Sequence, residues 1–299
     1  MIVVLAGGTG GAKLARGMLD VAGDELAVVA NTADDLEIYG AHVSPDPDLC
    51  AFWLADRIDE RGWGLRGDTF HAMEQLRELG VDVWFNLGDR DLAIGLRRAE
   101  RLREGATLTQ AMAELTAALG LRARVLPMSD APVRTRVLAR GRWHSLQEFL
   151  IRERGEGPVD GVELAGAAAA RAPGAVLEAI AAARAIVIGP SNPIISIRPI
   201  LDVPGVGEAL RAARAPVVAV SPIVGGQVLK GPTEAFMAWA GLALSAAGIA
   251  SAYRGLVAGI VADEPVDSEV ASLQVDTRMD DAAARRRVAE DVLAFAEAL

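Results

Sequence analysis

Short apolar runs, each followed by turn residues, recur along the whole chain. Six runs of β-branched and aliphatic residues predict buried strands, over residues 2–5, 26–29, 81–85, 185–188, 217–220 and 256–261. Several of them are separated by segments with helical periodicity, over residues 13–21, 68–79, 173–184 and 206–213. Strands that alternate with helices predict an α/β protein with a doubly wound, mainly parallel, Rossmann-like sheet.

The alternation of predicted strands and helices is interrupted between residues 93 and 170. This stretch contains a predicted helix over 108–119, two short predicted strands over 124–128 and 133–139, and a polar link over 152–157. We therefore expect one Rossmann-like domain over residues 1–299 that carries a lid-like, partly helical insertion over residues 93–170. The apolar run 236–250 is shorter than the ~20 residues that a membrane-spanning helix needs, so it predicts a buried core helix. Residues 280–299 predict a closing amphipathic helix.

Polar residues and glycines follow the predicted strands. Because the carboxyl ends of parallel strands meet at one edge of a sheet, these loops predict a single ligand site there. The loops contain Gly7, Gly8, Thr9, Gly10 and Gly11 after the first strand, Asn31, Asp34 and Asp35 after the second, Gly88, Asp89, Arg90 and Asp91 after the third, Ser191 and Asn192 after the fourth, and residues 221–226 after the fifth.

The glycine loop departs from two known phosphate-binding motifs. Lys13 stands where a dinucleotide fingerprint needs its third glycine, and Asn31 stands where that fingerprint needs an acid. Leu14 follows Lys13 where a P-loop needs a hydroxyl. Two interpretations stay open: backbone N–H groups that approach an anion or a flat ring at a helix N-terminus, or a tight turn without a ligand.

Three other segments carry candidate chemistry. In Ser44-Pro45-Asp46-Pro47-Asp48 two prolines restrict the backbone and present carboxylates, as hard-cation sites do, although Asp48 is equally well predicted as a helix cap. Arg90 between two acids can bind phosphate or belong to a surface network. Ser191, Asn192 and Arg198 suit a base or a phosphate, or a proline-rich turn.

Composition and charge exclude several classes of function. The formal net charge of -10 argues against a nucleic-acid partner. The single cysteine, Cys50, excludes an intrachain disulfide and fits a reducing cytoplasm, and we expect no signal peptide and no membrane association. The three histidines match no zinc spacing and no Ser-His-Asp arrangement. The chemistry is therefore expected from carboxylates, a metal ion and oriented dipoles.

The motifs together resemble a known family. The segments LAGGTGGAKLARG, NTADD, HVSPDPD, RGWGLRGDT, NLGDRDLA, LPMSD, GPSNPIISIRPIL and VSPIVGG are similar, in this order, to the phospholactate transferases of coenzyme F-420 biosynthesis and their phosphoenolpyruvate-using relatives. The resemblance implies a Mg²⁺-dependent, homodimeric, cytoplasmic enzyme. It implies that a ribityl hydroxyl of the deazaflavin Fo attacks a guanosine diphosphate-linked three-carbon acid (lactyl, enolpyruvyl or glyceryl) at the phosphorus that bears the acid, and expels GMP.

The resemblance also implies roles for individual residues. Asp46 and Arg90 match the catalytic positions that contact Fo, and Asp46 also matches a metal ligand. Asp48 and Asp68 are further metal candidates, and the glycine loop, Asn31, Asp35, Asp89, Ser191 and Asn192 are candidate ligand contacts. Arg198 stands where a small residue is expected, and its cation would meet the carboxylate or phosphate of the three-carbon acid, so the identity of that acid stays open.

Two other classes compete with this interpretation. A non-catalytic, nucleotide-sugar-binding regulator shares the fold and the glycine-rich start, but the continuation of NTADD into Leu36-Glu37-Ile38-Tyr39 and then SPDPD favours the transferase. An NAD-linked oxidoreductase is disfavoured by Lys13 and Asn31.

Overall fold

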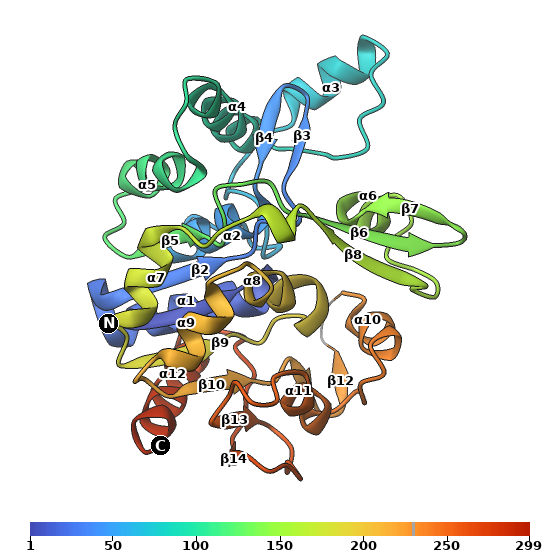
Figure 1. The fold of residues 1–299 in the computed structure, drawn as a ribbon. Coiled ribbons are helices and arrows are strands. Elements are labelled where there is room, and N and C mark those ends of the chain that lie inside the picture. The colour runs from blue at the N-terminus through green and yellow to red at the C-terminus, as the bar shows by residue number, and fades with distance from the viewer. Residues whose placement is uncertain (229–230) are drawn as a thin grey trace.

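A seven-stranded parallel sheet forms the centre of the protein in the computed structural model, which describes residues 1–228 and 231–299 (Figure 1). Its strand order is β14-β13-β10-β9-β1-β2-β5, and every pairing within it is parallel. Its strands are β1 (Ile2–Ala6), β2 (Leu26–Ala30), β5 (Arg124–Pro127), β9 (Ala185–Ile188), β10 (Val217–Val220), β13 (Gly259–Ala262) and β14 (Ala271–Gln274). In chain order the sheet runs 3-2-1-4-5-6-7, so the predicted doubly wound fold is confirmed and the strand order reverses between β1 and β9.

The inner strands are apolar throughout because helices cover both faces of the sheet. Alternate side chains enter two separate cores: Val4 and Val28 face one core, and Leu5 and Val29 face the other. The first core is closed by helices α1 (Gly8–Ala22), α2 (Pro45–Leu54), α5 (Leu108–Ala118) and α12 (Ala282–Glu297). The second is closed by α7 (Gly174–Ala181), α8 (Arg198–Leu201), α9 (Val206–Ala212) and α11 (Ala246–Ala252).

Two small units project from the sheet (Figure 1). The first combines the hairpin β3 (Leu36–Ile38) and β4 (Ala41–Val43) with α3 (His71–Glu78) and α4 (Asp89–Arg103), around Met73 and Leu87. The second is the antiparallel sheet β7-β6-β8 with α6. Its elements are β6 (Arg134–Ala139), β7 (Arg142–Ser145), β8 (Gly161–Ala165) and α6 (Leu146–Ile151).

The remaining elements are short. They are the hairpin β11 (Ile223–Val224) and β12 (Gln227–Val228), helix α10 (Thr233–Trp239), the 3₁₀ turns η1 (Gly23–Glu25) and η2 (Ala167–Ala169), and the π-helical turn η3 (Pro193–Ile197). Within the described ranges, no helix combines the length and the apolar character that a membrane crossing requires.

The structure corrects three predictions about elements. The strand predicted over residues 81–85 is wrong, because this segment is part of the loop between α3 and α4. The Gly88-Asp89-Arg90-Asp91 motif therefore does not follow a sheet strand; it lies at the start of helix α4. The single core helix predicted over 236–250 is wrong, because the chain forms α10 and α11 with a break between them. Strand β5 lies in the range assigned to the insertion, yet it pairs with β2 in the central sheet.

Candidate functional site

Two cavities open beside the carboxyl ends of the central strands. We call them the switch-point cavity and the aromatic cavity. The switch-point cavity has a volume of about 500 Å³ and is lined by the loops after β1, β9 and β10. The aromatic cavity has a volume of about 450 Å³ and is enclosed by the start of α2, the loop before α3 and the loop before α4. Both volumes are in the range of small-molecule sites.

The glycine loop forms one wall of the switch-point cavity together with the loop after β9. The backbone N–H of Gly7 donates a 3.2 Å hydrogen bond to Ser191 Oγ. A Cβ atom at Gly10 would lie 2.1 Å from the carbonyl oxygen of Pro190, and one at Gly11 would lie 2.6 Å from Ser191 Oγ. Only glycine therefore allows these two loops to meet at the point where the strand order reverses.

Helix α1 presents its N-terminus to this cavity. Its first turn contains no acidic residue, and Gly7 at the N-cap offers no side chain to the free N–H groups. The N–H of Gly8 donates to Asp46, so the positive end of the helix dipole and the N–H groups of the next residues in the first turn form the site suited to an anion.

The aromatic cavity combines flat apolar walls with carboxylates. Five aromatic side chains line it: Phe52, Trp63, Phe70, Trp84 and Phe85. Four acids line it as well: Asp46, Asp48, Asp68 and Asp91. Stacked aromatic walls suit a planar ring system, and carboxylate oxygens accept hydrogen bonds from hydroxyl groups and ring N–H groups.

Asp46 lies where the two cavities meet. It lines the aromatic cavity, while its Oδ1 accepts a 2.6 Å hydrogen bond from the backbone N–H of Gly8, which lines the switch-point cavity. Its Oδ2 accepts a 2.9 Å hydrogen bond from the amide of Asn31. Burial raises the pKa of Asp46 to about 6, against the two hydrogen bonds, which lower it. This carboxylate is held in a fixed orientation and can accept a proton near neutral pH.

Further buried carboxylates surround Asp46. Asp34 accepts a 3.2 Å hydrogen bond from Gln147 and a 3.4 Å one from Asn31, and burial together with the charge of Asp46 raises its pKa well above the usual range. Asp35 accepts hydrogen bonds from Ser44 Oγ (2.7 Å) and from His42 Nε2 (3.1 Å). This concentration of buried negative charge would be relieved by a cation next to Asp46.

Asp48 is neutralised within the protein. Arg98, which is buried, donates from both terminal nitrogens to the two carboxylate oxygens of Asp48, with one of these bonds at 3.0 Å. Asp48 also does not cap helix α2, whose N-cap is Ser44. The Asp48–Arg98 pair therefore anchors α2 to α4 beside the aromatic cavity.

Asp68 and Asp89 cap each other's helices. Asp68 Oδ1 accepts a 2.9 Å hydrogen bond from the backbone N–H of Arg90 at the start of α4, and Asp89 accepts hydrogen bonds from the backbone N–H groups of His71 (3.1 Å) and Ala72 (3.0 Å) at the start of α3. A Cβ at Gly88 would lie 2.1 Å from Asp68 Oδ2, so the close approach requires glycine. These caps hold the two loops that wall the aromatic cavity.

The predicted site residues fall into three groups. The structure brings Gly7, Gly8, Thr9, Gly10, Ser191 and Asn192 to the switch-point cavity, and Asp46, Asp48 and Asp68 to the aromatic cavity. Three further residues lie next to the cavities without lining them. The Asn31 amide donates to Asp46, Asp35 belongs to the same group of buried acids, and Gly11 is buried against the loop after β9. Asp89, Arg90 and Arg198 line neither cavity; Arg198 is exposed and pairs with Asp202 at 3.1 Å. The single site expected from the sequence is thus two adjoining cavities.

Sequence reasoning missed the aromatic walls and the far wall of the switch-point cavity. Trp63 and Trp84 gave a signal, because aromatic residues make up only 4% of this chain and these two lie 21 positions apart in glycine- and asparagine-containing loops. Asp91 belongs to a loop that the sequence places at the predicted ligand site, but it received no role of its own. It lines the aromatic cavity, and burial and the charges of Asp48 and Asp68 raise its pKa to about 7. Thr277 and Asp280, from the segment before α12, gave no motif.

The fold and the cavities define a Rossmann-like protein with two adjoining cavities of small-molecule size at the carboxyl ends of its central strands. Comparison with known proteins then specifies the family: the chain belongs to the 2-phospho-L-lactate transferase CofD family, which matches residues 2–294. The resemblance inferred from the motifs is confirmed, and the family is one of transferases that act on small molecules.

Individual relatives agree with this assignment. The chain is 41% identical over 266 residues to a 2-phospho-L-lactate transferase of Methanosarcina mazei, covering 88% of this chain and 87% of the relative. It is 38% identical over 313 residues to a phosphoenolpyruvate transferase of Kitasatospora aureofaciens, covering 99% of this chain and 98% of the relative. A crystal structure of a UPF0052 family member from Bacillus halodurans, 19% identical, shares the fold with a TM-score of 0.61 over 98% of both chains.

Proposed function

We propose that this protein transfers a phosphorylated three-carbon acid from its guanosine diphosphate conjugate to the ribityl hydroxyl of the deazaflavin Fo, and releases GMP, with Mg²⁺ as cofactor. The observation that carries the proposal is the position of Asp46, a buried carboxylate shared by an anion-binding cavity and an aromatic cavity. A transferase needs such a junction, because donor and acceptor must meet at one reacting bond.

The switch-point cavity suits the donor. The α1 N-terminus and the backbone of the glycine loop would receive the pyrophosphate, as helix N-termini receive phosphates in other α/β proteins. Ser191 Oγ and Asn192 border the same space, although the Asn192 Oδ1 is engaged by the backbone N–H groups of Ile194 (2.9 Å) and Ile195 (3.1 Å). The Asn192 amide nitrogen donates a 3.3 Å hydrogen bond to Thr233 Oγ1, so Asn192 supports the loop and leaves only its second amide hydrogen for a ligand.

The aromatic cavity suits Fo. A deazaflavin is a planar ring that carries a polyhydroxylated chain, and the cavity offers Trp63, Trp84 and Phe85 for the ring and carboxylates for the hydroxyl groups. The chain would then extend toward Asp46, where the two cavities meet.

In the proposed reaction the ribityl oxygen forms a bond to the phosphorus that bears the acid. The bond between that phosphorus and the bridging oxygen breaks, and GMP leaves with the bond electrons. Asp46 accepts the hydroxyl proton, a role that its orientation by Gly8 and Asn31 and its pKa of about 6 support.

The residues present fit a Mg²⁺ ion that binds together with the donor. Mg²⁺ is commonly held by one or two carboxylates, substrate phosphates and water, and it would offset the charge of the pyrophosphate. Asp46 is the carboxylate next to the switch-point cavity. Burial and the charges of Asp46 and Asp35 raise the pKa of Asp34, so a cation beside these acids would favour their ionised forms. Asp48 and Asp68 are less suited, because Arg98 neutralises Asp48 and neither residue lines the switch-point cavity.

The proposal is tested by incubating the protein with Fo, Mg²⁺ and each of the three guanylylated acids in turn. Mass spectrometry should show GMP together with the matching phosphodiester of Fo for at least one acid. GMP without a new deazaflavin product would indicate hydrolysis, and no turnover with any of the acids, despite binding of GDP, would favour a nucleotide-binding regulator.

A further inference from the structure

Helix α6 borders both cavities, although it belongs to the antiparallel unit beside the central sheet (Figure 1). Leu150 in its last turn lines the switch-point cavity, and the next residue, Ile151, lines the aromatic cavity. The start of the helix is fixed by a capping box, in which Ser145 Oγ accepts from the N–H of Glu148 (3.2 Å) and the Glu148 carboxylate accepts from the N–H of Ser145 (2.9 Å). A firmly capped helix therefore touches both ligand sites, and the proposed reaction gives it no role.

One side chain of α6 contacts the buried acids instead of a cavity. Gln147 lines neither cavity and is 8% exposed, and its Nε2 donates a 3.2 Å hydrogen bond to Asp34 Oδ2. Asp34, which follows strand β2, is buried to the same extent. The bond joins two groups that lie 113 residues apart in the chain, and its loss would leave both with an unsatisfied buried polar atom. Gln147 is thus placed to act on carboxylates of the protein and not on a ligand.

A chain of hydrogen bonds connects Asp34 with Asp46 through Asn31. Asn31 Nδ2 donates to Asp34 Oδ1 at 3.4 Å and to Asp46 Oδ2 at 2.9 Å, so one amide group serves both carboxylates. The 3.4 Å bond is close to the limit for a hydrogen bond, and a small rotation of the Asp34 carboxylate would break it. Gln147 opposes that rotation, because it holds the other oxygen of the same carboxylate.

We propose that Gln147 is a positioning residue for the transfer: acting through Asp34 and Asn31, it fixes the orientation of the Asp46 carboxylate. The inference rests on the proposed function, in which Asp46 accepts the proton of the ribityl hydroxyl while that oxygen bonds to phosphorus. A base acts only when a free lone pair points at the hydroxyl, and a misplacement of about 1 Å can lower a rate by about 100-fold. Because α6 also borders both cavities, the base is oriented by the helix that both ligands approach.

The test compares two variants of the full-length protein. Gln147→Met replaces the amide by an apolar side chain of nearly the same length. Its kcat for transfer should fall about tenfold, while the affinities for GDP and for Fo, measured by calorimetric titration, should stay within about twofold of wild type. Gln75→Met is the matched control: on the exposed surface of α3 it removes a 3.0 Å hydrogen bond from the same kind of amide to Glu78, and it should leave kcat and both affinities unchanged.

A double variant shows whether Gln147 acts through Asp46. In an Asp46→Asn background, Gln147→Met should not lower the residual kcat further, because the base that it orients is absent. A purely structural role would lower kcat by the same factor again. If Gln147→Met does not fold, Gln147→Asn tests the same contact with the same expected results, because its amide is one carbon too short to reach Asp34.

Three results would overturn the inference and leave the proposed function intact. They are a wild-type kcat in Gln147→Met, weaker GDP or Fo binding with an unchanged kcat, which would make α6 a cavity wall only, and an additive loss of kcat in the double variant. A folded wild type that transfers no acid from any of the three conjugates would contradict the proposed function, and the inference with it.

Discussion

The backbone N–H of Gly8, the first residue of α1, donates a 2.6 Å hydrogen bond to Oδ1 of Asp46, the second residue of α2. The N-termini of two helices therefore converge on one buried carboxylate, and their positive ends favour its ionised form. Burial acts in the opposite direction, and the resulting pKa of about 6 is what a general base at neutral pH requires.

Replacing Asp46 should separate activity from stability. We expect Asp46→Asn to lower kcat by at least about 100-fold, since it removes the proton acceptor and the candidate Mg²⁺ ligand. The melting temperature at neutral pH should stay close to that of wild type. The neutral side chain escapes the desolvation that raises the pKa, but its NH2 group faces a donor, either the Gly8 N–H or the Asn31 amide, and loses that hydrogen bond. Steady-state kinetics and calorimetry measure both, and a variant with full activity at saturating Mg²⁺ would contradict the role given to Asp46.

The pKa of Asp46 also sets a pH dependence. The ionised form is the active one, so kcat/KM should fall tenfold per pH unit below a pKa of about 6, with no such limb in Asp46→Asn. For stability the sign is opposite: because the folded-state pKa lies above the unfolded value of about 3.9, the contribution of Asp46 to stability falls as pH rises from about 4 to 6, and Asp46→Asn should remove this contribution. A kcat/KM that is flat between about pH 4.5 and 8 would count against this assignment.

Magnesium should bind with the nucleotide rather than alone. Among the residues that the structure describes, no group of three or more histidine, cysteine, aspartate or glutamate side chains forms a ready metal site. Mg²⁺ alone should therefore leave the melting temperature unchanged, whereas Mg²⁺ with GDP should raise it above the value with GDP alone. If Mg²⁺ alone raised the melting temperature as much as Mg²⁺ adds in the presence of GDP, the protein would carry a complete metal site of its own.

Gly10 should be required for the approach of the loops after β1 and β9. A methyl group at this position would lie 2.1 Å from the carbonyl oxygen of Pro190, so Gly10→Ala should destabilise the protein by about 2 kcal/mol or more and weaken GDP binding. Gly174→Ala is the control, since no atom lies within 4 Å of its added methyl group and it begins α7; we expect a stabilisation of about 0.5 kcal/mol. Urea unfolding of both variants measures the difference, and equal effects would refute the argument.

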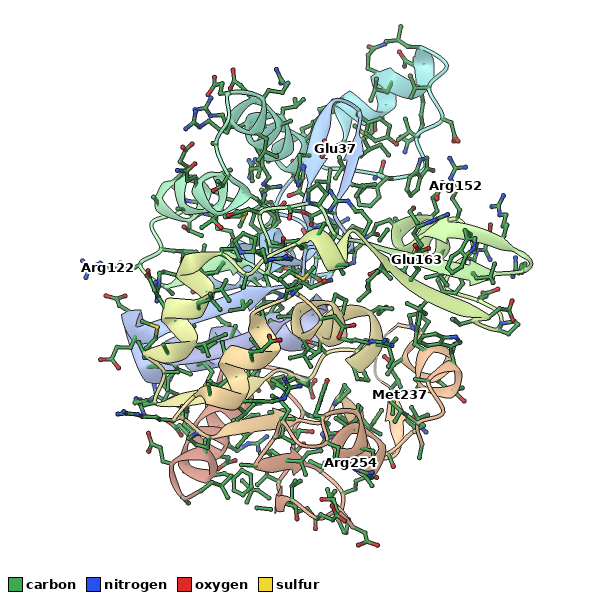
Figure 2. The ribbon with its side chains drawn as sticks, viewed as in Figure 1. Glu37, Arg122, Arg152, Glu163, Met237 and Arg254 are labelled. Atoms are coloured by element: carbon green, nitrogen blue, oxygen red, sulfur yellow. The ribbon has the colours of Figure 1, made fainter. Side chains whose placement is uncertain are left out.

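Trp84 should contribute to acceptor binding only. Its ring lines the aromatic cavity, and the Arg152 guanidinium lies 5.0 Å from the ring centroid. Figure 2 shows Arg152 between the α3 loop and the β6-β7-β8 unit. Trp84→Ala should weaken Fo binding about tenfold or more and leave GDP binding unchanged. Trp143→Ala removes a tryptophan that lies on β7 and lines neither cavity, so Fo binding should stay at the wild-type level. A loss of GDP affinity in Trp84→Ala would show that the cavities are not separate.

The central sheet could be predicted from the sequence, because its inner strands are buried on both faces and read as continuous apolar runs. The same reasoning failed at residues 81–85, where Trp84 and Phe85 line the aromatic cavity and Val83 packs on the cluster around Met73, without pairing in a sheet. Strand β14 was not predicted, because it is an edge strand whose residues are mostly exposed. Its sequence Ala-Ser-Leu-Gln therefore contains no apolar run.

The site was predictable where a motif marks it. The glycine loop and the SPDPD segment fall at the two cavities, since both are set by local backbone geometry. The pairing of Asp48 with Arg98, 50 residues away, and the mutual capping by Asp68 and Asp89 depend on how α4 docks, which no local pattern encodes. These contacts determine which carboxylates remain available to a ligand.

The most direct test of the account is a crystal structure of the protein with GDP, Mg²⁺ and Fo bound together. The account predicts the pyrophosphate at Gly7–Gly10, the deazaflavin ring between the walls formed by Trp63 and Trp84, and the terminal ribityl hydroxyl within hydrogen-bond distance of Asp46. A complex in which Fo lies outside the aromatic cavity, or in which Asp46 contacts neither ligand, would contradict it.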